Sequence, residues 1–431
     1  MPTPTKWDTL LYLHFTNSAT FNELSATLRV NIFFENLNNR MLYKRLGELI
    51  DAELVIRKRN TTKKQTVYNI NRGNPSLNNY MAFLLWSMKE GLDYNILLSK
   101  RAQDIVFSTI GHGPSTLKTL HEYTGNSKNT LKKYIRILER NRFVRIIKQK
   151  PLCIDFNLND RTLFYLTLMQ PPCSLAEKTG KYSRLINEID TIKERISGSN
   201  ELMELVIKMH IYSTTVTEGN TANKDDVERV MKDLPTWLTP REIVEIRNTF
   251  EAVKHLNNHI KGLSMDFSKD FGQDMDLEPN SENIKLYHRI LMGGLIEESG
   301  EYYASPGKRI LGSKLKLPAT IEEIEYEIVA IVNFYKMYKE HLHPLLLGAF
   351  IHFLLVTVHP FKDGNGRVTR IIHSMVLLKA GYPLFVFDPD MKNRYFDMLE
   401  VGRLENLDGF VGFILEEYKN ALEELADSKE P

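Results

Sequence analysis

The sequence predicts a mainly α-helical protein in which two small α+β domains precede one large helical domain. Charge divides the chain, because residues 1–160 hold 24 Lys and Arg against 13 Asp and Glu, net +11, whereas residues 161–431 hold 32 against 41, net −9. The basic part alternates helical with β-prone segments, and the acidic part has apolar residues at helical spacing almost throughout. A chain of 431 residues is expected to hold two or three domains.

The basic part contains a weak internal repeat. The apolar pattern of residues 46–55 recurs in residues 135–144, each time as an amphipathic helix that runs into a strand. In the first copy, a shorter helix is expected at residues 22–29 and two strands at 54–59 and 66–70. In the second copy, the shorter helix is expected at 115–123 and the two strands at 144–148 and 153–157. Helix, helix and hairpin resemble the winged-helix fold, which predicts winged-helix domains at residues 1–77 and 101–160, joined by a helical segment at 78–100.

Winged helices often place their third helix in the major groove of DNA. The corresponding cations here are Arg40, Lys44 and Arg45 in the first copy and Lys128, Lys132, Lys133 and Arg136 in the second, and the first wing adds Arg57, Lys58, Arg59, Lys63 and Lys64. Such charge would make DNA binding fall with salt. A solvated basic face, or a winged helix that contacts proteins, explains these residues about as well, and no DNA sequence preference can be read from them.

The acidic part is expected to be helical at residues 183–196, 201–212, 224–232, 240–261, 281–292, 320–341, 345–358, 367–379, 392–399 and 407–425. The exception is residues 300–318, where a turn at Pro306-Gly307 between β-prone residues predicts a hairpin. Pro171-Pro172 predicts a linker, and the acidic residues 264–279 predict a surface loop.

One segment carries the chemistry: His359-Pro-Phe361-Lys-Asp363-Gly364-Asn365-Gly366-Arg367-Val-Thr-Arg370. The proline and the two glycines end the apolar helical run before them, so a tight loop should lead into the next helix. Backbone N–H groups that converge at such a loop and helix start attract phosphate. Arg367 and Arg370 project from one face of that helix and suit two phosphate groups.

Two further side chains of the segment suit a nucleoside triphosphate. Asp363 offers a hard oxygen to Mg²⁺, which normally keeps several waters and takes one or two carboxylates beside the phosphates. His359 suits a general base, because an ordinary imidazole titrates near neutrality. The segment therefore predicts a site for ATP with Mg²⁺ as cofactor.

Other interpretations of the segment are weaker. A calcium loop would need Gly and Glu where Val368 and Ser374 stand. The chain has no Gly-Lys-Ser/Thr of a Walker loop. A zinc site at His352, His359 and Asp363 lacks the usual ligand spacing. A plain helix cap with solvated arginines would explain one glycine and one arginine, but not the whole set.

The segment resembles the signature of the Fic family, H-P-F-x-D-G-N-G-R-x-x-R, at all nine fixed positions. The resemblance implies a compact helical domain at residues 161–431, with His359 as the base, Asp363 as the metal ligand, and nucleotide contacts from Gly364, Asn365, Gly366, Arg367, Arg370 and Tyr395. Core packing explains Tyr395 equally well. The resemblance also implies a β-hairpin flap that holds a target segment by main-chain pairing, with Arg309, Ile310, Leu311 and Gly312 on it and Tyr303 where the family has Arg.

A second motif lies upstream of the signature. Residues 214–220, Thr-Thr-Val-Thr-Glu-Gly-Asn, match the inhibitory pattern of the Fic family, Ser/Thr-x-x-x-Glu-Gly/Asn. By this resemblance, Glu218 would pair with Arg370 and occupy the place of the γ-phosphate. Taken alone, Glu218-Gly219 would be explained as an ordinary helix end.

These resemblances imply an adenylyltransferase that moves AMP from MgATP to a Ser, Thr or Tyr hydroxyl of a protein. The target protein would be able to be the chain itself. The resemblances also imply that Glu218 inhibits the enzyme. The alternative is a DNA-binding regulator that senses nucleotide and has little transferase activity. The motif does not separate AMP transfer from transfer of another phosphate-containing group or from removal of AMP. Double-stranded DNA and a second copy of the chain are further candidate partners.

Composition favours a cytoplasmic protein. Residues 1–15 lack the basic head and apolar core of a signal peptide, and the longest uncharged apolar stretch, residues 348–358, is too short to span a bilayer. Cys153 and Cys173 are the only cysteines and have neither metal nor redox spacing. No membrane partner and no disulfide framework are therefore expected.

Overall fold

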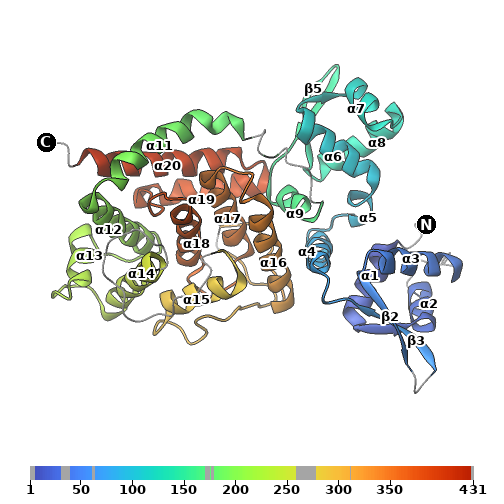
Figure 1. Ribbon diagram of the computed structural model, residues 1–431, viewed down its shortest axis with the longest axis horizontal. Coiled ribbons are helices and arrows are strands. Elements are labelled where there is room, and N and C mark those ends of the chain that lie inside the picture. The colour runs from blue at the N-terminus through green and yellow to red at the C-terminus, as the bar shows by residue number, and fades with distance from the viewer. Residues whose placement is uncertain are drawn as a thin grey trace. The chain divides into compact units, whose positions relative to one another are not determined.

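The structure, a computed structural model, describes residues 5–30, 39–60, 64–169, 175, 179–258, 278–310 and 312–428 (Figure 1). Contacts divide the chain into two compact units, Met1–Ile105 and Val106–Pro431. Several features discussed above lie outside the described residues, namely Lys63, Leu311, the linker at Pro171-Pro172 and residues 264–277 of the predicted surface loop.

The first unit packs helices against a three-stranded antiparallel sheet. Its elements are α1 (Lys6–Thr16), β1 (Ser18–Thr20), α2 (Phe21–Val30), α3 (Asn39–Asp51), β2 (Val55–Asn60), β3 (Gln65–Ile70), α4 (Pro75–Lys89), α5 (Tyr94–Leu97) and the start of α6 (Lys100–His112). The strand order is β1-β3-β2, with Val55 opposite Ile70. Leu42, Leu46 and Leu49 of α3 are buried because they recur on one helical face.

The second unit contains the second copy of the repeat. Its elements are β4 (Ser115–Thr116), α7 (Leu117–Thr124), α8 (Lys128–Arg140), β5 (Val144–Gln149) and β6 (Leu152–Phe156), in the strand order β4-β6-β5. The third helix of each copy is followed by a left-handed residue, Glu53 at φ 55° and Arg142 at φ 61°. The predicted helices and strands of the repeat are present, and a short strand is added to each sheet. The winged-helix resemblance remains a prediction.

The rest of the second unit is helical. It consists of α9 (Asp160–Met169), η1 (Gly180–Tyr182), α11 (Ser183–Ser197), α12 (Asn200–Thr217), α13 (Lys224–Met231), α14 (Pro240–Asn258), α15 (Ser281–Met292), α16 (Ile321–Tyr338), α17 (Pro344–Val358), α18 (Asn365–Lys379), η2 (Pro389–Met391), α19 (Lys392–Leu404) and α20 (Asp408–Asp427). The prediction of a mainly helical protein is therefore confirmed.

Helix α17 forms the centre of this helical part. Every residue from Leu345 to Val358 is buried, as expected for a helix that is apolar on all sides. It contacts α16, α18 and α20, and α18 in turn contacts α12, α14 and α15 (Figure 1). The segment between α17 and α18 is the signature loop, residues 359–364. Two buried helices thus fix both of its ends.

The flap, residues 300–318, differs from its prediction. The chain turns at Pro306-Gly307 as expected, but its described residues form no strand. The flap is instead bonded to other parts of the fold. The backbone N–H of Tyr303 donates to the carbonyl of Pro360 at 2.9 Å. The hydroxyl of Ser313 donates to the carboxylate of Glu400 at 2.6 Å. The flap is therefore a loop fastened to the signature loop and to α19, and not a β-hairpin.

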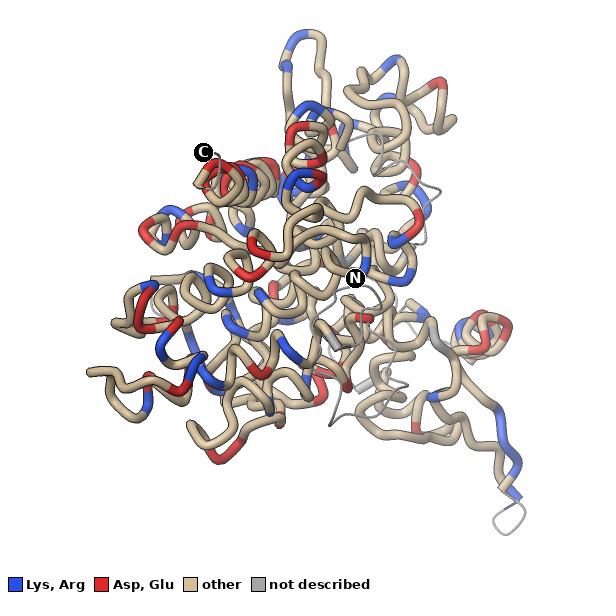
Figure 2. The backbone as a smooth tube through the Cα atoms, turned by 60° about the vertical axis from the view of Figure 1, so that its left-hand side comes forward, with Lys and Arg blue, Asp and Glu red and all other residues tan. Residues whose placement is uncertain are grey.

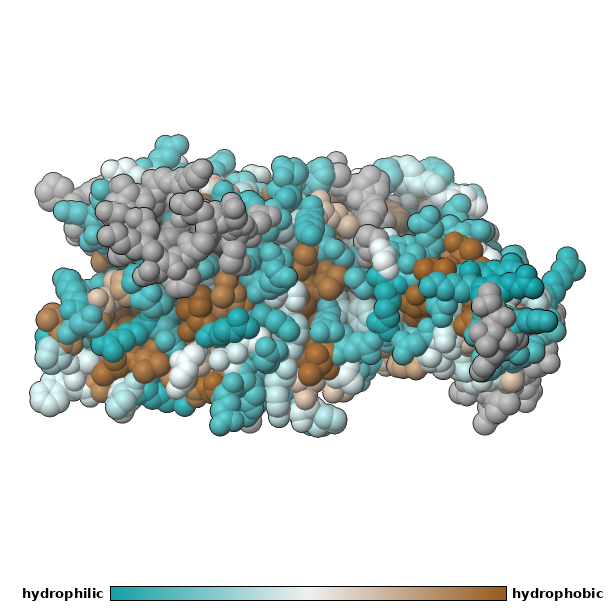
Figure 3. All heavy atoms as spheres, turned by 60° about the horizontal axis from the view of Figure 1, so that its bottom comes forward, coloured by the Kyte–Doolittle hydropathy of each residue, from teal (hydrophilic) through white to brown (hydrophobic). Residues whose placement is uncertain are grey.

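No helix among the described residues is long and apolar enough to cross a bilayer. On the face drawn in Figure 3, apolar residues form small groups that hydrophilic residues separate. A mixed surface of this kind is usual for folded domains.

Candidate functional site

The signature loop depends on two left-handed residues. His359 ends α17 with φ 53° and ψ 56°, and Gly364 precedes α18 with φ 75°. A Cβ atom at Gly364 would lie 2.5 Å from Sδ of Met292, so both the backbone angle and the packing against α15 require glycine. The loop therefore ends with the backbone N–H groups of the first turn of α18 unpaired within the helix, as anion binding requires.

Asn365 shapes the loop from inside. Its Oδ1 accepts the N–H of Phe361 and its Nδ2 donates to the carbonyl of the same residue, both at 2.9 Å. The side chain is 4% exposed. Its amide is therefore committed to the loop backbone, which leaves its own N–H as the group with which Asn365 would contact a phosphate.

His288 holds the other side of the loop and was not identified from the sequence. The N–H of Gly300 donates to its Nδ1 at 2.7 Å, so Nε2 carries the proton and donates to the carbonyl of Asp363 at 3.0 Å. The ring of Phe361 stacks on the imidazole, with centroids 3.7 Å apart. Burial lowers the pKa of His288 to about 4. A neutral imidazole thus fixes the backbone of the predicted metal ligand.

The Asp363 carboxylate points to the open side of the loop. Its side chain is 46% exposed, and its closest cations are Arg241 and Arg367, each at 3.8 Å. Its Oδ1 also accepts the N–H of Gly364 at 2.6 Å. No group of three His, Cys, Asp or Glu that could hold a metal occurs among the described residues. One open carboxylate fits Mg²⁺, which takes its other ligands from water and phosphates.

The two arginines of the signature are buried and are paired with carboxylates from other helices. Arg370 is 1% exposed, and its Nη2 lies 2.6 Å from Oε1 of Glu218 and 3.1 Å from the carbonyl of Thr214. Arg367 is 3% exposed and its Nη1 lies 3.4 Å from Oε1 of Glu245. Buried charges require such partners, because removal of one partner leaves the other uncompensated. The Glu218–Arg370 pair that the sequence predicts is therefore present in the structure.

Glu218 reaches the loop because position 366 has no side chain. Glu218 follows the last residue of α12 as its C-cap, at φ −86° and ψ 2°. A Cβ atom at Gly366 would lie 2.2 Å from its Oε1 and 3.2 Å from Nη1 of Arg370. The carboxylate thus occupies the space directly beside the first turn of α18, where an anion would otherwise bind.

Helix α14 contributes residues that the sequence did not reveal. Glu245 accepts the amide of Asn220 at 3.0 Å and the Nε of Arg241 at 3.4 Å, in addition to its ion pair with Arg367. Asn220 ends the inhibitory motif, so Glu245 connects that motif to the first signature arginine. The helix itself was expected at residues 240–261, but no pattern in the sequence marks Glu245 as part of the site, because these contacts arise only when the helices pack.

The electrostatics at His359 favour a base. Burial, followed by the positive charges of Lys308 and Arg403, lowers the pKa of His359 to about 4, against an opposing effect of Glu218. The imidazole is therefore neutral at physiological pH. A neutral imidazole can accept a proton, as general base catalysis requires.

Tyr395 lies in the core. It is 2% exposed, and its hydroxyl lies 2.9 Å from Nε2 of His352, whose Nδ1 is 3.1 Å from Nδ1 of His373. Burial raises the pKa of Tyr395, and the charges of Arg370 and Glu218 also reach it. Its position is thus close to the signature arginines, although its ring is enclosed by other side chains.

The remaining predicted residues lie on exposed surfaces. Arg309 and Gly312 of the flap are exposed and Ile310 is partly buried. Arg40 and Lys44 are exposed on α3, where Arg45 pairs with Glu48 at 3.2 Å. The cations of α8, namely Lys128, Lys132, Lys133 and Arg136, are all exposed. Figure 2 shows further Lys and Arg along the β2–β3 hairpin of the first unit.

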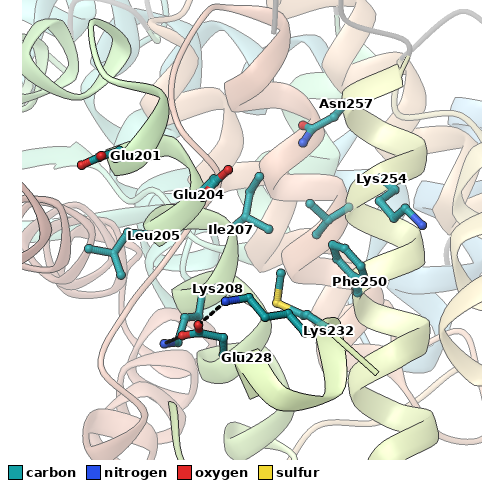
Figure 4. Close-up of a pocket in the computed structure, with 12 residues that line it drawn as sticks. Glu201, Glu204, Leu205, Ile207, Lys208, Glu228, Lys232, Phe250, Lys254 and Asn257 are labelled. Carbon is teal, nitrogen blue, oxygen red and sulfur yellow. Dashed lines mark hydrogen bonds and ion pairs between the residues drawn. The ribbon is translucent and has the colours of Figure 1, made fainter. Parts of the chain in front are cut away.

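A separate cavity of about 370 Å³ lies between α12, α13 and α14 (Figure 4). Apolar side chains such as Leu205 and Phe250 line it, and Lys208 and Lys232 meet Glu228 at its side, each at 2.6 Å. No signature residue lines it. The cavity is therefore distinct from the site between α17 and α18.

Comparison with known proteins identifies relatives of this site. Residues 278–377 match the family model described as Fic/DOC family. The chain is 26% identical over 229 residues to "Protein adenylyltransferase Fic" of Drosophila willistoni, covering 52% of this chain and 43% of that protein. The protein of the same name from Drosophila yakuba is 26% identical over 243 residues, 54% of this chain and 46% of that protein. The chain thus spans less than half the length of these curated relatives. A solved Fic family protein from Desulfovibrio desulfuricans is 22% identical, with a TM-score of 0.47 over 59% of this chain and 76% of that chain.

Proposed function

Because residues 278–377 of this chain match the family model described as Fic/DOC family, we propose that the protein is an adenylyltransferase that moves AMP from MgATP to a Ser, Thr or Tyr hydroxyl of a protein. The observation that carries the proposal is the loop between α17 and α18. It begins at His359, the C-cap of α17, and leads into the first turn of α18, which carries the two buried arginines Arg367 and Arg370. The chain itself is a candidate target.

The proposed reaction starts at the imidazole. His359 takes the proton of the target hydroxyl while that oxygen attacks the α-phosphorus, and the bond from the α-phosphorus to the bridging oxygen breaks to release pyrophosphate. Positioning and charge stabilisation provide most of the acceleration in phosphoryl transfer. The N–H groups of Asn365 and Gly366, and that of Gly364 once Asp363 releases it, would bind phosphate oxygens, and Arg367 and Arg370 would offset the charge that develops on the leaving pyrophosphate.

Glu218 would hold the site inactive. As long as its carboxylate binds Arg370 at 2.6 Å, this guanidinium is not free for the γ-phosphate, and the carboxylate also repels the anion. ATP would then bind in a position unsuited to transfer. Glu245 would hold Arg367 in place throughout, because its contacts with Asn220 and Arg241 do not involve Glu218.

Mg²⁺ would be held by Asp363, and when bound it would neutralise charge on the phosphates. Incubation of the Glu218→Gly variant with ATP labelled at the α-phosphate should therefore label protein, whereas γ-labelled ATP should not. Removal of Mg²⁺ with EDTA, or the substitution Asp363→Asn, should lower the α-label at least about 100-fold. The matched control is Asp397→Asn, at an exposed position of α19. Equal transfer of γ-label, or full labelling in EDTA, would refute the proposed reaction.

The target would dock on the flap. Arg309, Ile310, Leu311 and Gly312 would offer main-chain groups to an extended segment of the target. The described part of the flap contains no strand of its own, and the N–H groups of Lys308 and Ser313 make turn hydrogen bonds to the carbonyls of Ser305 and Ile310. Two alternatives are transfer of another phosphate-containing group and removal of AMP assisted by Glu218. The mass of the protein product of the labelling experiment distinguishes both from transfer of AMP.

A second function is favoured by the exposed cations of α8. We propose that the two repeats are winged helices that bind double-stranded DNA, so that the enzyme also regulates transcription or senses nucleotide while bound to DNA. The support is that Lys128, Lys132, Lys133 and Arg136 are all exposed on the same helix. Cations in this arrangement suit phosphates.

DNA binding should depend on salt. In fluorescence anisotropy with duplex DNA, Lys132→Ser/Lys133→Ser is expected to weaken binding and to lower the slope of log affinity against log salt by about two. The control Arg184→Ser/Lys224→Ser removes the same charge from exposed sites on α11 and α13 and should leave the slope unchanged. Parallel titrations with ATP test the nucleotide-sensing alternative. Equal loss in both variants would indicate nonspecific attraction only.

A further inference from the structure

The flap places a lysine against the backbone of the predicted base. Lys308 follows the Pro306-Gly307 turn, and its Nζ donates to the carbonyl of Phe361 at 2.5 Å and lies 3.4 Å from the carbonyl of His359. Five residues earlier in the same loop, Tyr303 donates its N–H to the carbonyl between them, that of Pro360, at 2.9 Å. The flap therefore binds three consecutive carbonyls of the signature loop.

The carbonyl of His359 lies at the end of α17, and those of Pro360 and Phe361 lie in the loop that follows it. The last carbonyls of a helix have no partner within it, and a cation near the C-terminus is favoured by the helix dipole. His359 ends α17 in a left-handed conformation, so the chain turns away from the helix and exposes the carbonyls of His359 and Phe361. The Nδ2 of Asn365 donates to the carbonyl of Phe361 at 2.9 Å. The Nζ of Lys308 in the flap contacts the carbonyls of both His359 and Phe361.

We propose that Lys308 is a positioning residue for the transfer reaction, which fixes the backbone of His359 through the carbonyls of His359 and Phe361. This inference rests on the proposed function and goes beyond it, because the family signature does not include the residue. It also gives the flap a second role, since the same loop that would hold the target would also order the base.

The charges around His359 determine the expected effect. Besides burial, the pKa of His359 responds to Lys308 from the flap, to a backbone hydrogen bond with Val356 that raises it, to Arg403 from α19 and to Glu218 from the end of α12. The two cations oppose protonation of the imidazole, and Glu218 favours it. Burial lowers the pKa of Lys308 itself to about 8, so the lysine is still charged at neutral pH. Loss of this charge should therefore raise the pKa of His359.

The test compares three variants in a Glu218→Gly background. Lys308→Met removes the donor and the charge and keeps the length of the side chain, whereas Lys308→Arg keeps both. Lys336→Met, at an exposed position of α16, is the matched control. We expect Lys308→Met to lower kcat by about tenfold, to leave KM for ATP unchanged and to move the acidic limb of the pH profile to higher pH. Lys308→Arg and Lys336→Met should behave like the parent.

A second measurement does not depend on activity. NMR titration of the His359 imidazole in the nucleotide-free protein should show a higher pKa in Lys308→Met than in the parent, with thermal unfolding as a check on the fold. If the Glu218→Gly parent transferred no label, the proposed function would be wrong. The NMR titration of His359 would then still test the role of Lys308. An unchanged pH profile together with an unchanged His359 titration would overturn the role of Lys308.

Discussion

Replacement of His359 by alanine is expected to lower AMP transfer by about 10²–10⁴-fold, the usual contribution of a general base, while binding of MgATP stays close to that of the parent. The reason is that different groups of the site are expected to activate the target hydroxyl and to bind the triphosphate. The imidazole is neutral and would act on the target hydroxyl, whereas the groups expected to bind the triphosphate are the N–H groups of the loop, Arg367 and Arg370. Labelling with α-labelled ATP measures the first quantity, and calorimetric titration with MgATP measures the second.

The pH dependence provides an independent check on the base. Because the pKa of His359 is lowered to about 4, the active neutral form is present at neutral pH and is lost only as the pH falls through that value. The acidic limb of kcat/KM should therefore lie well below the ordinary imidazole value of about 6.5. His341→Ala, at an exposed position after α16, is the control. Full labelling by His359→Ala would exclude the histidine as the base.

Much of the helical architecture could be predicted from the sequence. Residues 281–292 were expected to be helical and form α15 (Ser281–Met292), because an apolar face recurs at helical spacing. Helix α1 was missed although its signal is present: the hydroxyl of Thr5 and the carboxylate of Asp8 form a capping box. The missed helix shows that a start signal without a strong apolar period is easy to overlook.

The parts of the site that escaped prediction depend on packing. Glu245 is far from Arg367 in sequence, and only the contact between α14 and α18 brings the two charges within 3.4 Å. The flap illustrates the opposite error. The turn of the flap lies where the sequence predicts it. The predicted strands do not pair, because the N–H of Tyr303 donates to the carbonyl of Pro360 and not to the second arm of the flap. Local propensity cannot decide between partners that only the tertiary structure supplies.

Glu218→Gly is expected to increase AMP transfer by at least about tenfold, which corresponds to about 1.4 kcal/mol. The guanidinium of Arg370 is 1% exposed and its ion pair with Glu218 is 2.6 Å long. Removal of one partner from such a buried pair leaves an uncompensated charge, at a cost of about 3–5 kcal/mol. A phosphate that binds Arg370 would recover part of this cost. The variant should thus bind MgATP more tightly and unfold at a lower temperature without it.

The backbone effect of glycine can be separated from the loss of the carboxylate. Glu90 ends α4 with φ −86° and ψ −3°, almost the angles of Glu218, −86° and 2°. Glu90→Gly therefore reproduces the change at a helix end of the first unit, and it should not alter labelling. Glu218→Gln removes the charge but keeps an acceptor for Arg370, so its activity should lie between those of the parent and Glu218→Gly. If parent and Glu218→Gly were labelled equally and strongly, the ion pair would have no inhibitory role, because Arg370 would then be available to the phosphates even with the carboxylate in place.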